Sequence, residues 1–167
     1  MGTGMTGMQE VRIRQGRPSD RRVLVRLLAS QGMATDVDPV DFIMAEVNGR
    51  LLGAARLAWV GTDDAFLRPI VVATEARGAG LGRALLERLF AVCSSISVIA
   101  RGDAVPFYRR LGFTAMDWSS VPSEYRDECE CCDDLAQCRP MSMRWNIKDE
   151  GASAAGELMS CPRRLNE

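Results

Sequence analysis

A glycine-rich segment between an apolar run and an apolar-periodic stretch has residue types suited to binding an anion. It consists of Arg77, Gly78, Ala79, Gly80, Leu81, Gly82 and Arg83. Glycines let the backbone turn its N–H groups toward one point, and the N-terminus of a following helix adds partial positive charge there. The segment therefore predicts a cradle for a phosphate-bearing ligand.

The glycine spacing narrows the kind of phosphate site. Gly78, Gly80 and Gly82 follow the pattern Gly-x-Gly-x-Gly. Rossmann proteins instead carry Gly-x-Gly-x-x-Gly, and P-loop proteins continue with Gly-Lys-Ser or Gly-Lys-Thr. The expected strands before the loop form antiparallel hairpins and no opening parallel βαβ unit, so a dinucleotide-binding fold is disfavoured.

A cysteine cluster is the second group with possible chemistry. Cys129, Cys132 and Cys138 fall within ten residues of one another. Three thiolates suit tetrahedral zinc, with Cys131, Cys161 or an acid as the fourth ligand, although a second Cys-x-x-Cys pair is missing. Reduced thiols that pack the segment, or a redox pair, are the alternatives.

The sequence contains six cysteines and no histidine. Without histidine there is no Ser-His or Cys-His nucleophile, no imidazole base and no zinc site with a histidine ligand. Any acid-base chemistry therefore falls to Tyr, Cys, Lys, carboxylates or water.

The elements that must position these residues follow from the apolar periodicity and the turn residues. A helix is expected from Pro18 to Gly32, and Asn48-Gly49 predicts a hairpin turn. The other expected helices are 82–93 and 104–111, and the expected strands are 11–14, 42–47, 51–60, 65–72, 97–100, 113–116 and 141–147.

Length and composition predict one folded domain. The chain has 167 residues and is 47% hydrophobic, enough to bury a sizeable core without disulfides. We expect a disordered N-terminus at 1–10, a domain at 11–147 with a polar cysteine-rich insertion at 119–140, and a loose tail at 148–167.

The charge balance argues against two classes of partner. Lys and Arg number 21 and Asp and Glu number 22, so no overall field favours nucleic acid or an anionic membrane. The sequence shows no apolar run long enough to span a bilayer and no signal-peptide pattern at its start. We expect a cytoplasmic protein with neither nucleic-acid nor membrane partners.

Two motifs together resemble the GNAT superfamily of acyl-CoA-dependent N-acyltransferases. The first is Arg77 to Gly82, similar to the family's Gln/Arg-x-x-Gly-x-Gly/Ala. The second is Ala104 to Phe113, similar to Ala-x-x-Phe-Tyr-x-x-Leu-Gly-Phe. The resemblance covers about residues 11–147 and implies the GNAT fold, of α/β (α+β) class, in which helices flank a mixed, mostly antiparallel central sheet.

The resemblance also implies how acetyl-CoA would bind. The amides of residues 77–83 would hold its pyrophosphate, and the main chain of Ile70, Val71 and Val72 would bind pantetheine and the thioester. Tyr108 corresponds to the family's tyrosine that protonates the departing thiolate. From the residues alone, Ile70 to Val72 also fit a buried strand and Tyr108 a core tyrosine.

The acceptor is expected to be a primary amine on an amino-acid-like small molecule. Residues 122–143 resemble short glutamate N-acetyltransferases, and Leu67-Arg68 resembles arsinothricin-type amino-acid N-acetyltransferases. Arg68 could hold an acceptor carboxylate with its planar fork, or be an exposed strand arginine. Residues 66–69 carry no acid, so no base is assigned, which favours an α-amine over lysine.

These features predict an N-acetyltransferase that moves an acetyl group directly from acetyl-CoA to the amine. The family also makes a homodimer an expectation. The alternative is a non-catalytic module that senses acyl-CoA, metal or redox state through the cysteine cluster.

Overall fold

The computed structural model describes residues 10–149 of the 167-residue chain. The expected disordered start therefore lies almost wholly outside the described residues, as does the expected tail from residue 150 onward. The described chain divides into two compact units, one containing the residues up to Leu57 with Pro69–Arg88, the other Ala58–Arg68 with the residues from Leu89. The division falls within two strands and one helix, and the prediction of one domain over 11–147 stays a prediction.

The structure has seven strands, β1 (Val11–Gln15), β2 (Phe42–Val47), β3 (Arg50–Trp59), β4 (Asp64–Val72), β5 (Ser95–Ala100), β6 (Thr114–Ala115) and β7 (Met141–Asn146), among its described residues. They belong to one sheet with the order β1-β2-β3-β4-β5-β7-β6. The pairs β1–β2, β2–β3, β5–β7 and β6–β7 are antiparallel, and β4–β5 is parallel. The expected mixed, mostly antiparallel sheet with helices is confirmed.

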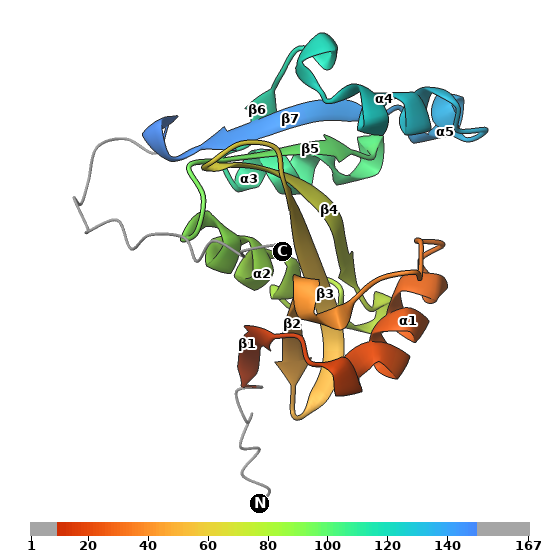
Figure 1. Cartoon of the computed structure of the whole chain (residues 1–167), viewed down its shortest axis with the longest axis vertical. Helices are drawn as coiled ribbons and strands as arrows, with labels where there is room; N and C mark the ends of the chain where they lie inside the picture. The colour runs from red at the N-terminus through yellow and green to blue at the C-terminus, as the bar shows by residue number, and fades with distance from the viewer. Residues whose placement is uncertain (1–9, 150–167) are drawn as a thin grey trace, which may run out of the picture. The chain divides into compact units, whose positions relative to one another are not determined.

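The first unit holds the N-terminal strands and the glycine loop. Its elements are β1 (Val11–Gln15), α1 (Arg21–Ser30), β2 (Phe42–Val47), most of β3 (Arg50–Trp59), the end of β4 (Asp64–Val72) and most of α2 (Leu81–Phe90). Asn48 and Gly49 have φ of 51° and 75°, so the predicted hairpin turn between β2 and β3 has the left-handed backbone that these residue types tolerate. Figure 1 shows this unit's strands in red to yellow.

The core of the first unit comes from one face of each helix and alternate strand residues. Leu24, Leu27 and Leu28 are buried at the three- and four-residue spacing of one helical face. Phe42 and Met44 of β2 are fully buried, as alternation along a half-buried strand requires. The helix α1 begins after Asp20, close to the predicted start.

An ion-pair network ties β1 to the turn before α1 and to β2. Arg14 NH1 and NH2 lie 2.7 and 2.9 Å from the two carboxylate oxygens of Asp20, and Arg14 Nε donates to Glu46 at 2.8 Å. The hydrogen bonds from Arg14 hold the pKa of Asp20 below its usual range. The pairing also raises the pKa of Arg14.

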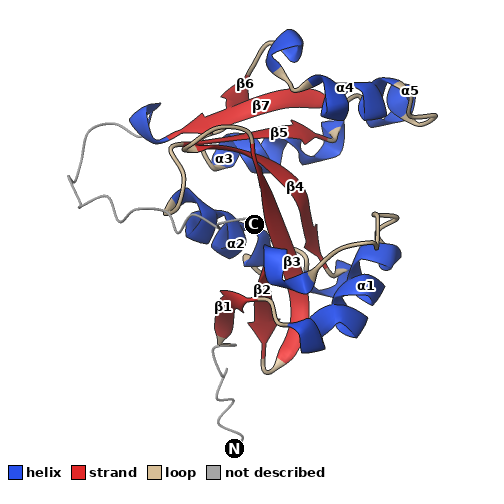
Figure 2. Ribbon diagram, viewed as in Figure 1, coloured by secondary structure: helices blue, strands red, loops and turns tan. Residues whose placement is uncertain are grey.

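The second unit holds the start of β4 and the C-terminal half of the described chain. Its other elements are β5 (Ser95–Ala100), α3 (Val105–Arg110), β6 (Thr114–Ala115), α4 (Ser123–Glu130), α5 (Leu135–Cys138) and β7 (Met141–Asn146). The helix α2 ends at Phe90, before the predicted Cys93, because the Val92 N–H closes a tight turn onto the Leu89 carbonyl at 3.0 Å. Figure 2 shows that the expected insertion forms the short helices α4 and α5.

An aromatic cluster fills the core of the second unit. Phe90 stacks on Trp145 with centroids 4.1 Å apart, and Phe113 lies 6.0 Å from Phe90. Ile96 and Met143 are fully buried beside them on paired strands. The apolar residues of β5 and β7 therefore meet around the ring cluster.

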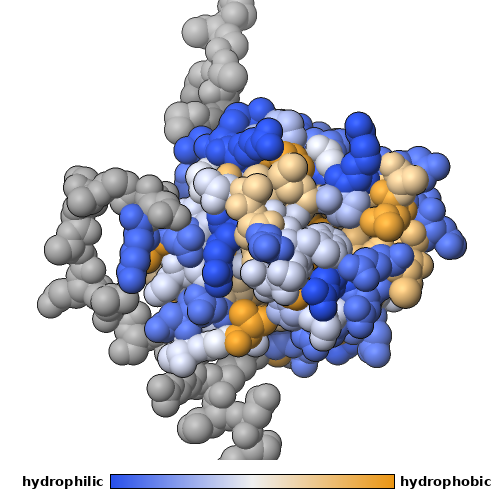
Figure 3. Space-filling view, turned by 90° about the horizontal axis from the view of Figure 1, so that it is seen from above, coloured by the Kyte–Doolittle hydropathy of each residue, from blue (hydrophilic) through white to orange (hydrophobic). Residues whose placement is uncertain are grey.

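The surface in Figure 3 is mostly hydrophilic, with separate apolar patches. Among the helices described between residues 10 and 149, none combines the length and apolar character needed to cross a membrane.

Candidate active site

The glycine loop links the end of β4 to the start of α2 through a short 3-10 turn, Thr74–Ala76. Gly78 and Gly80 have φ of 80° and 84°, a left-handed backbone that side chains with a Cβ rarely adopt. A Cβ placed on either residue meets no atom within 4 Å among the described residues. Glycine is therefore required here by the backbone, while the space beside the loop stays open.

The helix α2 supplies the second feature of an anion site. It begins at Leu81, directly after Gly80, and runs for 10 residues. The first N–H groups of a helix have no partner within the helix and carry its partial positive charge. Because the loop before α2 is exposed, these amides and those of the loop suit a solvent-borne phosphate.

Arg77 lies at the entrance of the loop and is held by the end of α1. Its guanidinium donates to the side-chain oxygen of Gln31, and the Gln31 nitrogen donates to the Thr74 hydroxyl at 3.2 Å. The sequence analysis missed Gln31, because nothing in the spacing of residues 31 and 77 predicts contact. Gln31 thus connects both sides of the turn that precedes the glycines.

Arg83, the other predicted cation of this segment, makes a different contact. Its Nε donates to the Glu87 carboxylate at 2.8 Å, one turn later along α2. Both side chains are largely exposed, so this pair is of the weak surface type.

The end of β4 alternates between half-buried and buried residues. Val71 is buried, whereas Ile70 and Val72 are half-buried. A Cβ on Gly53 would lie 3.3 Å from the Val71 carbonyl oxygen and from Leu85 of α2. Because Gly53 has no side chain, β3 can lie close to the end of β4 and to α2. The sequence analysis also missed this residue.

The strands β4 and β5 pair over only three residues. Their parallel register runs Asp64↔Ser95, Ala65↔Ile96 and Phe66↔Ser97. From Ser95 to Ala100, β5 also pairs with β7. Leu67 and Arg68, the next residues of β4, lie beyond this parallel register, as a splayed strand requires.

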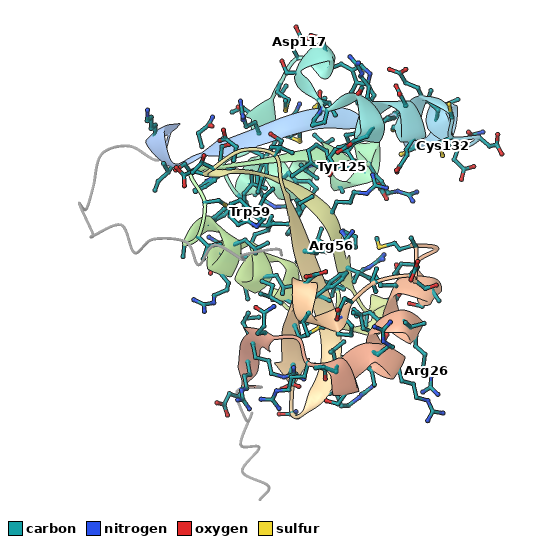
Figure 4. The ribbon with its side chains drawn as sticks, viewed as in Figure 1. Arg26, Arg56, Trp59, Asp117, Tyr125 and Cys132 are labelled. Atoms are coloured by element: carbon teal, nitrogen blue, oxygen red, sulfur yellow. The ribbon has the colours of Figure 1, made fainter. Side chains whose placement is uncertain are left out.

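Arg68 is held by two residues of α4 in the insertion. Its Cζ lies 5.0 Å from the centroid of the Tyr125 ring, and its Nη2 donates to the Glu128 carboxylate. Tyr125 also stacks on Phe66, with centroids 4.3 Å apart. The Arg68 side chain is 37% exposed, so it is anchored and still reachable from solvent; Figure 4 marks Tyr125.

Tyr108 of α3 is a buried phenol in the aromatic cluster. It is 5% exposed, and its ring meets Phe107 and Phe113 edge to face at 5.1 and 5.2 Å. Burial raises the pKa of Tyr108, so the phenol stays protonated at physiological pH. The phenol of Tyr108 can therefore donate a proton, and its ring also packs in the core of the second unit.

The predicted zinc site is not supported. Among residues 10–149, no group of three or more His, Cys, Asp or Glu side chains is arranged to hold a metal. Cys129 lies in the last turn of α4, whereas Cys132 lies past that helix and Cys138 ends α5. Burial, with smaller contributions from Cys138 and Cys132, raises the pKa of Cys129, which disfavours the thiolate that zinc needs. Cys161 lies outside the described residues.

The predicted site residues thus form two groups. The loop and residues 70–72 lie in the first unit, and Arg68 and Tyr108 in the second. Within the second unit the structure adds Tyr125 and Glu128 around Arg68. Their separation of about 60 residues from Arg68 hid this contact from sequence reasoning.

The sequence is similar to those of known acetyltransferases. Residues 38–115 match the family model described as the acetyltransferase (GNAT) domain. An uncharacterised N-acetyltransferase from Chlorobaculum tepidum is 26% identical over 108 residues, which cover 62% of this chain and 68% of that protein. The chloroplastic serotonin N-acetyltransferase 2 of Oryza sativa subsp. japonica is 43% identical over 78 residues, 44% of this chain and 38% of its own length.

A solved structure shows the same fold. N-acetylglutamate synthase from Neisseria gonorrhoeae, complexed with coenzyme A and N-acetyl-glutamate, matches with a TM-score of 0.64 at 19% identity. The match covers 83% of this chain and 35% of that protein. The chain therefore spans about two thirds of the bacterial relative and little more than a third of the rice enzyme and the synthase.

Proposed function

We propose that the chain is an acetyl-CoA-dependent N-acetyltransferase of the GNAT superfamily that acetylates the α-amine of an amino-acid-like small molecule. Its match to the acetyltransferase (GNAT) domain over residues 38–115 and its similarity to an N-acetyltransferase from Chlorobaculum tepidum support the proposal. The observation that carries the proposal is the glycine loop before α2, whose left-handed Gly78 and Gly80 leave an open cradle. The rice enzyme and the synthase match this chain over only part of their length. The identity of the acceptor is therefore a matter for experiment.

The loop fits the pyrophosphate of acetyl-CoA in charge and in space. Amides at the start of α2 supply donors and partial positive charge. Arg77 adds a guanidinium that Gln31 holds beside the loop. Bound acetyl-CoA would supply an activated acetyl group, and the main chain of Ile70 to Val72 would align its pantetheine.

The transfer is direct and needs no covalent enzyme intermediate. The neutral amine attacks the thioester carbonyl carbon, so a C–N bond forms as the C–S bond breaks. The nitrogen loses its proton to water, and the thiolate takes one from the phenol of Tyr108, which solvent then reprotonates. Positioning of the two substrates accounts for most of the expected acceleration.

An α-amine suits a site with no acid in residues 66–69. Deprotonating a peptide-like α-amine with a pKa near 8 at pH 7 costs about 1 kcal/mol, whereas a lysine side chain at about 10.4 costs nearer 5 kcal/mol. The cost for a free amino acid lies between these limits. Water can therefore accept the proton of an α-amine without a dedicated side-chain base.

Arg68 is the proposed binding group for the acceptor carboxylate. Its guanidinium is a planar fork that matches a carboxylate, and it is partly open to solvent. The solved synthase with N-acetyl-glutamate supports an amino-acid acceptor. Similarity to the serotonin N-acetyltransferase makes serotonin, an amine without a carboxylate, the second candidate.

The test follows release of the coenzyme A thiol with purified protein, acetyl-CoA and a panel of acceptors. The panel contains glutamate, other amino acids, serotonin and a lysine-containing peptide. Turnover with an amino acid is expected. Turnover with serotonin alone would contradict the carboxylate assignment, and acetyl-CoA binding without turnover on any amine would favour the acyl-CoA-sensing module.

A further inference from the structure

We propose that Tyr125 and Glu128 are positioning residues that hold Arg68 ready for the acceptor carboxylate, which makes α4 the specificity element of the enzyme. This inference rests on the proposed function, because it assigns Arg68 to acceptor binding. It adds a role for the insertion, whose sequence first suggested metal chemistry.

Tyr125 contacts both Phe66 and the guanidinium of Arg68. Phe66 and Arg68 are two residues apart on β4, so their side chains project from the same face of the strand. The Tyr125 ring stacks on Phe66 with an interplanar angle of 21°, and the Arg68 Cζ lies 5.0 Å from that ring's centroid. One aromatic ring therefore covers the strand residue and supports the cation above it.

Glu128 restricts rotation of the same group. It follows Tyr125 by three residues on α4, a spacing that puts both side chains on one helical face. Its carboxylate accepts from Nη2 of Arg68. The five N–H donors of a guanidinium lie in one rigid fork, so a contact at Nη2 restricts the direction of the whole fork.

The arrangement contributes more to specificity than to folding. Glu128 is 59% exposed and Arg68 37% exposed, and exposed ion pairs stabilise proteins by only about 0–1 kcal/mol. Removal of either α4 contact should leave the fold intact. A freely rotating Arg68, however, must lose more conformational entropy when it binds a carboxylate.

The experiment compares Glu128→Ala and Tyr125→Leu with the wild type on the preferred amino acid and on serotonin. We expect the KM for the amino acid to rise about five- to tenfold, the size of couplings between contacting residues. The kcat, the KM for acetyl-CoA and the KM for serotonin should stay within about twofold, since interactions at distant sites are independent.

Three variants separate positioning from general structure. Tyr125→Phe keeps the ring and Glu128→Gln keeps the hydrogen-bond acceptor, so both should recover most of the lost affinity. Asp127→Ala removes a neighbouring exposed carboxylate of α4 that faces another side of the helix, and it should change no kinetic parameter.

A double-mutant cycle with Arg68→Lys decides the outcome. The effect of Glu128→Ala should vanish in the Arg68→Lys background if Glu128 acts through Arg68. If Arg68→Lys does not alter discrimination between amino acid and serotonin, the carboxylate assignment of the proposed function fails. If Arg68→Lys alters it but neither α4 variant does, the positioning role is overturned. It is also overturned if both α4 variants lower Tm and raise every KM together.

Discussion

Tyr108 combines burial with a proposed chemical role, and its phenol can be removed with little change in shape. Tyr108→Phe keeps the ring contacts with Phe107 and Phe113 but cannot donate a proton. General acids typically contribute about 10²–10⁴-fold, so we expect kcat to fall by about 100-fold. The Kd for acetyl-CoA, measured by calorimetry, should not change.

The pH profile gives a second readout for Tyr108. The acid must be protonated to act, and burial raises its pKa above the ordinary value of about 10. The wild-type kcat should therefore show no alkaline decline from this group below about pH 10. A decline between pH 8 and 9 that disappears in Tyr108→Phe would contradict a phenol with a raised pKa.

At the scale of elements, the link between β4 and α2 depends on a backbone that excludes a Cβ. Gly80→Ala forces alanine into the left-handed region at a cost of about 1–2 kcal/mol. It should also disturb the amides of the cradle. We expect a lower unfolding free energy and a KM for acetyl-CoA raised about tenfold, in line with a loss of about 1.4 kcal/mol of binding.

Gly49→Ala is the matched control for this loop. Gly49 has φ of 75° in the β2–β3 turn, and a Cβ there also meets no described atom within 4 Å. Its stability loss should be similar, with the KM for acetyl-CoA unchanged. An equal rise of that KM in both variants would show that Gly80 acts only through the fold.

The Arg14 network links β1, the turn before α1 and β2, and predicts how acid destabilises this unit. Arg14 lowers the pKa of Asp20, so the stabilising contribution is present above the unfolded pKa of about 3.9. It is lost as pH falls through the lower folded value. Asp20→Asn should reduce the unfolding free energy at pH 7 by about 2 kcal/mol, typical of hydrogen bonds to charged groups.

Urea denaturation at pH 7 and pH 3 checks this prediction. The difference between wild type and Asp20→Asn should shrink at the lower pH. Asp36→Asn, which removes an exposed carboxylate, should change neither value. A constant difference at both pH values would mean that Asp20 stabilises the unit in another way.

For the whole molecule, a ligand that binds only the folded state must raise Tm. At a concentration about 100 times its Kd, acetyl-CoA should stabilise the protein by about 2.7 kcal/mol, or very roughly 5–10 °C. NAD at the same concentration should shift Tm less. A larger shift with NAD would favour a dinucleotide-binding site.

Cytoplasmic location and a homodimer stay predictions.

The sequence determined the local features of this protein, because they depend on residues close together in the chain. Asn48-Gly49 predicted the hairpin, Gly78 and Gly80 predicted a turning loop before a helix, and the apolar periodicity predicted the strands and main helices within a few residues. The two motifs predicted the family whose model matches residues 38–115. Backbone sterics and periodicity act over a few residues, so they are visible without a structure.

Only the tertiary structure decided what surrounds the predicted site residues. Arg68 is 60 positions from Glu128, and Arg77 is 46 positions from Gln31, so no local pattern reveals either contact. The cysteines illustrate the converse, since nearness in sequence suggested zinc whereas the described residues form no metal-binding group. Ligand geometry depends on side-chain directions set by helix ends and packing, which spacing alone does not specify.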